Sequence, residues 1–60
     1  MNIIRKALEF EKWFNSPQFP EELEMADVEE LVLVWAETNE VDLGDNMDAI
    51  CRKIVDLGIC

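Results

Sequence analysis

Apolar residues recur every three or four positions in the middle of the chain. Met25, Val28, Val32 and Trp35 follow this spacing, and Leu31 falls on the same side of a helical wheel. Such a period is typical of an amphipathic helix that buries one face. The pattern therefore predicts a central helix with these five side chains in the core.

A start signal precedes this apolar stripe. Asp27 stands three positions before Glu30, which matches a helix N-cap followed by an acid at the third helical position. Residues 31–35 are also rich in valine, which suits a strand equally well. We favour the helix, because the apolar spacing and the cap agree, and keep the strand as the alternative.

Two further helices are predicted on either side of the central one. The first spans residues 2–14, with Asn2 as its cap and a stripe formed by Ile3, Ala7, Phe10 and Phe14. The last begins at Asp45 or Asn46, runs to about Leu57, and buries a stripe formed by Met47, Ile50, Cys51 and Ile54. Gly58 fits the position after a helix, with Ile59 folding back on the last turn.

The sequence does not decide the structure of two connecting segments. Pro17 ends the first helix, and Pro20 with two acids after it starts either a short helix over residues 20–25 or one long helix over residues 20–39. Residues 41–43 alternate apolar and polar side chains and could pair with residues 31–38 as a hairpin. We predict a single all-α domain over residues 1–60, a three-helix or four-helix bundle. The alternative is an α+β fold in which a short β-hairpin packs on two helices.

Charge is distributed unevenly along the chain. The formal net charge is −9, and the five cations all lie near the two ends. Between Trp13 and Cys51 there is no Lys or Arg, but there are acids at Glu21, Glu22, Glu24, Asp27, Glu29, Glu30, Glu37, Glu40, Asp42, Asp45 and Asp48. Direct nucleic-acid binding and binding to anionic membranes are disfavoured, because both need Lys and Arg. A basic protein partner is the natural complement, although acidity also serves solubility alone.

Leu33 does not follow the apolar stripe of the central helix. Its helical neighbours are Glu29, Glu30 and Glu37, with Glu40 one turn further on. An apolar side chain inside a charged rim is the arrangement that interface hot spots use. These five residues are therefore the predicted partner-binding site, with Leu33 as the anchor. A single exposed leucine is also common on protein surfaces and often has no role.

No catalytic, cofactor-binding or metal-binding site is predicted. The chain has no histidine, and its cysteines, Cys51 and Cys60, have no neighbours that would lower a thiol pKa. Residues 42–48 gather oxygen atoms, but Gly44 and Lys53 stand at the wrong positions for a calcium loop of the EF-hand type. No secretory signal or membrane span is recognised, so we expect a cytoplasmic protein with free thiols.

Three non-enzymatic functions fit these observations. The first is a small inhibitor or adaptor that covers a basic surface on a larger protein. The second is an acidic mimic of nucleic acid, which would block a DNA-binding or RNA-binding protein through charge. The third is a homodimer that buries the remaining apolar residues Trp13, Phe19 and Leu33. We favour the first, because Leu33 supplies an apolar anchor that a pure charge mimic does not need.

Overall fold

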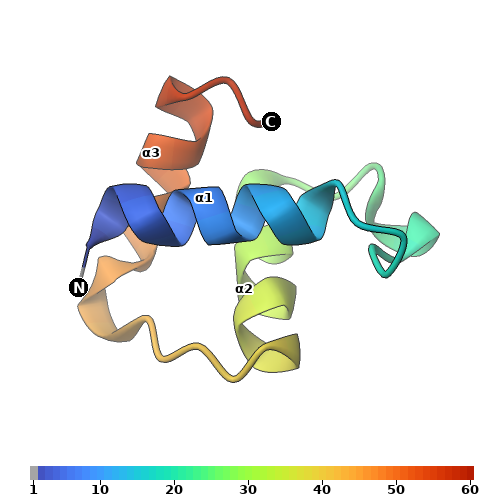
Figure 1. Cartoon of the computed structure of the whole chain (residues 1–60), viewed down its shortest axis with the longest axis horizontal. Helices are drawn as coiled ribbons and strands as arrows, with labels where there is room; N and C mark the ends of the chain where they lie inside the picture. Colours follow the sequence, from blue (N-terminus) through green and yellow to red (C-terminus); the bar gives the residue numbers. More distant parts are fainter. Residues whose placement is uncertain (1) are drawn as a thin grey trace.

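The computed structural model describes residues 2–60, and within them it contains three α-helices, two short 3-10 turns and no strand. The all-α prediction is confirmed, and the hairpin alternative is wrong. The elements in chain order are α1 (Ile3–Phe14), η1 (Glu21–Leu23), α2 (Val28–Thr38), η2 (Gly44–Asn46) and α3 (Met47–Asp56). In Figure 1, α1 crosses in front of both α2 and α3, and it packs against each of them.

Side-chain caps fix where the first two helices begin. The Asn2 Oδ1 atom accepts a hydrogen bond of 3.0 Å from the Arg5 amide, and the Asp27 Oδ1 atom accepts one of 3.0 Å from the Glu30 amide. Each bond satisfies an amide that the helix itself leaves without a partner. Both predicted caps are confirmed. Asp27 also settles the open question after Pro20, because a separate η1 turn precedes α2 instead of one long helix.

The start of α3 differs from the prediction. Asn46 occupies the N-cap position, but its side chain makes no capping hydrogen bond, and neither residue 45 nor residue 46 therefore caps the helix as expected. The η2 turn leads directly into α3, and the Asn46 amide donates to the Leu43 carbonyl at 2.9 Å. Backbone bonding in the preceding turn thus takes the place of a side-chain cap.

The last two helices end in the same way. After α3, the Ile59 amide donates to the Ile54 carbonyl at 3.1 Å, and Gly58 has a φ of 73°. This is the predicted Schellman ending, in which a left-handed residue follows the helix. After α2, the Val41 amide donates to the Ala36 carbonyl at 2.9 Å, and the left-handed residue is Glu40, with a φ of 55°. A side chain other than glycine rarely occupies this conformation.

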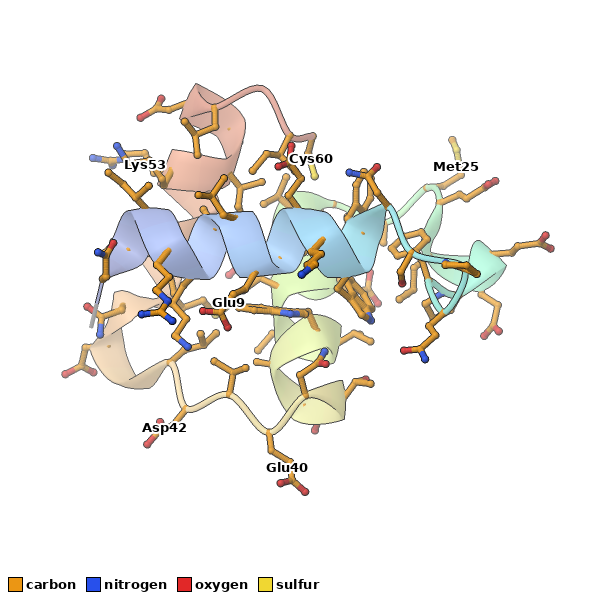
Figure 2. All side chains as sticks on the ribbon, viewed as in Figure 1. Glu9, Met25, Glu40, Asp42, Lys53 and Cys60 are labelled. Atoms are coloured by element: carbon orange, nitrogen blue, oxygen red, sulfur yellow. The ribbon has the colours of Figure 1, made fainter. Side chains whose placement is uncertain are left out.

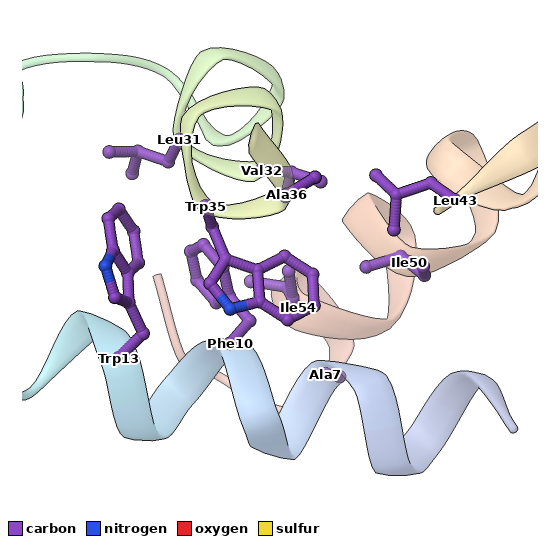
Figure 3. Close-up of a cluster of buried hydrophobic side chains, with 10 residues drawn as sticks. All are labelled: Ala7, Phe10, Trp13, Leu31, Val32, Trp35, Ala36, Leu43, Ile50 and Ile54. Carbon is purple, nitrogen blue, oxygen red and sulfur yellow. The ribbon is translucent and has the colours of Figure 1, made fainter. Parts of the chain in front are cut away.

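One core joins the three helices (Figure 3). Phe10 lies at its centre, and its ring contacts those of Trp13, Phe14 and Trp35 with centroids 5.7–5.8 Å apart. The buried side chains are Ala7, Phe10, Trp13, Leu31, Val32, Trp35, Ala36, Leu43, Ile50 and Ile54. The stripes predicted for the three helices supply most of this set. The core therefore holds α2 so that its opposite face remains in solvent.

Met25, Trp13 and Leu43 have environments that differ from the predicted ones. Met25 was expected in the core but is 96% exposed, because it lies before the first residue of α2 and projects from the far end of the molecule (Figure 2). Trp13 was expected to remain available for a dimer contact but is buried at 7% exposure. Leu43 was expected on a possible strand and instead packs in the core from the loop before η2.

Candidate functional site

The exposed face of α2 carries the predicted anchor. Leu31, Val32, Trp35 and Ala36 occupy the buried face, which turns Leu33 outward, where it is 51% exposed. Its position follows directly from helical geometry, since a residue one place from Val32 is rotated by about 100° around the axis. The structure thus leaves a leucine half exposed in the middle of the helix.

Carboxylates surround Leu33 on the same face. Glu29, Glu30 and Glu37 lie four before, three before and four after it, which are the spacings that make side chains neighbours on a helix. All three are exposed. The ion pairs found within residues 2–60 both involve Glu9, with Arg5 at 3.9 Å and with Lys6 at 3.4 Å. The carboxylates around Leu33 are therefore exposed and form no ion pair with a cation of residues 2–60.

Glu40 does not lie on α2 with the other four residues of the predicted binding site. It lies beyond Thr38, the last residue of α2, in the left-handed turn that closes the helix. Its side chain points away from the body of the protein (Figure 2). The predicted surface is therefore a helical face formed by Leu33 and three acids, with Glu40 at its C-terminal edge.

A groove between α2 and α3 adjoins this face. It has a volume of about 520 Å³, and its apolar lining comes from Val28, Cys51 and Val55. The charged groups that line it are Asp27, Glu29, Arg52 and Asp56. Glu29 thus belongs both to the groove and to the surface around Leu33. Sequence reasoning missed the groove, because it forms only where the first turn of α2 meets α3.

Cys51 was expected in the core; it is half-buried, packs against the edge of the core and also lines this groove. Burial raises the pKa of its thiol above the ordinary value of 9.0, and the carboxylates of Glu29, Asp48 and Asp27 raise it further. Burial also raises the pKa of the Cys60 thiol. Both cysteines are free, and both stay protonated at neutral pH, where a thiol is a poor nucleophile.

A second hollow of about 420 Å³ lies between the C-terminal halves of α1 and α2. Two of its polar side chains already bond the backbone. The Ser16 hydroxyl donates to the Trp13 carbonyl at 2.8 Å, and the Asn39 Nδ2 atom donates to the Trp35 carbonyl at 2.9 Å. Both hydrogen bonds form at the C-terminal ends of the two helices, so the side chains of Ser16 and Asn39 stabilise the fold.

The part of the chain that the structure describes contains neither a metal-binding cluster nor a membrane-spanning helix. Among residues 2–60 there is no group of three His, Cys, Asp or Glu side chains placed to hold a metal ion. No helix in the same part of the chain combines the length and apolarity needed to cross a membrane. Ile4 and Leu8 on α1 are also exposed, at 54% and 50%, but of the three only Leu33 has acids at all of its charged neighbouring positions, so the surface around Leu33 and the adjoining groove form the candidate site.

Comparison with known protein families, characterised proteins and solved structures finds no match to this chain.

Proposed function

We propose that this protein is a non-enzymatic interaction module that binds a basic surface of a larger protein through the exposed face of α2. One observation carries the proposal: Leu33 is half exposed and is flanked by Glu29, Glu30 and Glu37 on the same face. A central apolar side chain inside a polar rim is the usual arrangement of a binding hot spot. By covering such a surface, the protein would act as an inhibitor or adaptor.

Charge argues for a basic partner. The long interval without a cation between Trp13 and Cys51 includes all of α2, so the charged neighbours of Leu33 on its own helix are all acids. Complementary charge speeds diffusional encounter and excludes acidic competitors, whereas an apolar anchor slows dissociation. The rim and the anchor therefore contribute to different steps of the same association.

Leu33 alone cannot supply the whole affinity. Fully burying a leucine side chain is worth roughly 1.5–3 kcal/mol, and Leu33 is already half covered. A standard interface buries about 800 Å² on each partner, whereas the whole chain exposes 4359 Å². The partner must therefore cover about a fifth of the chain's surface, which extends well beyond Leu33.

The experiment compares Leu33→Asp with a matched control, Leu8→Asp. Leu33 and Leu8 are 51% and 50% exposed and lie on different helices. Proteins captured from a cell extract on the immobilised chain are quantified for the unmodified protein and for both variants. We expect a basic protein that Leu33→Asp loses and Leu8→Asp retains. Equal retention by both variants would contradict the proposal.

The same capture, eluted in steps of rising salt, separates the acidic mimic from the anchored module. A mimic would release nucleic-acid-binding proteins at moderate salt, with no dependence on Leu33. Light scattering tests the homodimer, which would double the chain mass of 7.0 kDa. Burial of Trp13 removes one of the three residues on which the homodimer was based.

We place this interaction in the cytoplasm. The two free cysteines support this, because thiols that do not pair are typical of proteins in a reducing compartment. Fusion of the chain to a fluorescent protein, followed by microscopy of the host cell, tests the location.

A further inference from the structure

We propose that the groove between α2 and α3 receives an apolar side chain of a basic amphipathic helix in the partner protein. This inference rests on the proposed function and deepens it, because it names the element of the partner that binds. The groove residues Val28, Cys51 and Val55 would hold the apolar side chain. Leu33 would contact the next turns of the same partner helix.

The groove has the size and the lining for this occupant. It has a volume of about 520 Å³ and is wide open to solvent, so it can receive a side chain that another protein carries. Val55 is 56% exposed, although it belongs to a helix whose other face is in the core. A groove of this kind between two helices commonly accepts the apolar face of an amphipathic helix.

The charges around the groove select a basic occupant. The rim contains three carboxylates, those of Asp27, Glu29 and Asp56, and one guanidinium, that of Arg52. Its net charge is therefore −2. The negative field reaches the groove itself, since the carboxylates of Glu29 and Asp27 act on the Cys51 thiol. Lysines or arginines beside the inserted apolar residue would complement this rim.

The geometry joins the groove to the surface around Leu33. Glu29 lines the groove, and Leu33 follows it by one helical turn, a rise of about 6 Å along α2. A partner helix that places apolar residues three, four and seven positions apart reaches both places. One continuous element therefore satisfies both contacts.

The same charges disfavour a second copy of this chain as the occupant. The copy would bring a chain of net charge −9 to a rim that is itself negative. Like charges brought together across an interface repel and disfavour the complex. Few cations are available for compensation, because there are only five in the whole chain.

The probe is a synthetic amphipathic peptide of about 14 residues, or four helical turns, made of leucine on one face and lysine on the other. The control peptide carries glutamate in place of lysine. Binding to the full-length, nitrogen-15-labelled chain is followed by two-dimensional NMR. We expect the lysine peptide to shift the amide signals of Val28, Cys51 and Val55, and the glutamate peptide to leave them unchanged.

Val55→Asp should weaken binding of the lysine peptide by about tenfold or more, because it places a charge where the apolar side chain docks. Leu57→Asp is the matched control, since Leu57 is 48% exposed near the end of α3 and does not line the groove. It adds the same charge and should change binding by less than about threefold. Circular dichroism checks that both variants are folded.

A chemical block gives a second measurement that does not depend on Val55. In a Cys60→Ser background, the only thiol is that of Cys51, and N-ethylmaleimide attached to it would occupy the groove. The modified protein should no longer bind the lysine peptide. Unchanged binding after complete modification would overturn the inference.

The variants also distinguish failure of this inference from failure of the proposed function. Loss of the captured partner with Leu33→Asp but not with Val55→Asp would overturn the groove and leave the surface around Leu33 intact. Loss with Val55→Asp alone would support the groove and remove Leu33 as the anchor. If neither variant affects the partner or the peptide, both proposals are wrong.

Discussion

Phe10 and Trp35 pack edge to face across the boundary between α1 and α2, with their ring centroids 5.7 Å apart and their planes at 89°. Phe10 is fully buried, and Trp35 is 2% exposed. This geometry places the positive edge of one ring over the negative face of the other, which adds about 0.5–1.5 kcal/mol to the gain from burial. The pair fixes the side of α2 that faces the core.

Phe10→Ala is therefore expected to unfold most of the protein at 25 °C. A change from a large buried aromatic to alanine costs roughly 3–5 kcal/mol, which is comparable to the total stability of a domain of this size. Far-UV circular dichroism during urea titration measures the effect. Leu33→Ala, at a half-exposed position, should change the free energy of unfolding by no more than about 0.5 kcal/mol. Equal midpoints for the two variants would contradict this account of the core.

Features determined by neighbouring residues were predictable from the sequence. The caps at Asn2 and Asp27 and the turn at Gly58 each depend on a side chain or a φ angle within a few positions of the helix end. The outward position of Leu33 followed from its place beside Val32 on one helix. Local geometry was therefore enough to predict that Leu33 lies on an exposed helical face, where it is 51% exposed.

Features determined by contacts between helices were not predictable. Cys51 belongs to the predicted α3 stripe and Val55 lies at its edge, and the two line a groove only because Val28 approaches them from α2. Trp13 also lies beside its own stripe, but Phe19 packs against it from the following connection, with ring centroids 5.1 Å apart. The periodicity of one helix does not specify which neighbour will cover its edges.

Glu40→Gly is expected to stabilise the protein by about 0.5–1 kcal/mol. Glu40 has a φ of 55° at the end of α2, a conformation that glycine adopts without the steric cost of a β-carbon. Part of the gain is offset by the greater freedom of glycine in the unfolded chain. The midpoint of urea unfolding measures the change.

Glu37→Gly is the matched control for this prediction. It removes the same charge one turn earlier, within α2, where glycine costs about 1 kcal/mol relative to a good helix former. The two variants should therefore shift the midpoint in opposite directions. A shift of the same sign in both would mean that charge, and not backbone conformation, decides their stability.

Asp27 has two roles that different substitutions separate. Asp27→Ala removes the acceptor for the Glu30 amide and should lower the free energy of unfolding by about 1 kcal/mol. Asp27→Asn keeps a capping oxygen but removes a charge from the rim of the groove, so it should nearly preserve stability. Thermal unfolding of the two variants measures the difference. Equal destabilisation would show that the charge of Asp27, through the helix dipole, matters more than its hydrogen bond.

The Cys51 thiol provides a pH-dependent test of the groove. Its pKa is raised above 9.0 in the folded protein, first by burial and then by Glu29, Asp48 and Asp27. As the pH rises through 9, the unfolded chain releases this proton before the folded chain does, so the free energy of unfolding falls until the folded-state pKa is passed. Below pH 9 both states keep the proton, and this thiol contributes no slope.

Cys51→Ala in a Cys60→Ser background should therefore flatten the loss of stability above pH 9, compared with the Cys60→Ser protein alone. Because Cys60 also has a raised pKa, its removal from both proteins isolates the effect of Cys51. The measurement is urea unfolding followed by tryptophan fluorescence between pH 7 and about 10.5, a range that spans the ordinary thiol pKa. High salt should weaken the carboxylate contribution and leave that of burial, since exposed charges are screened. An identical pH profile with and without Cys51 would show that the thiol is not held in an acidic, half-buried groove.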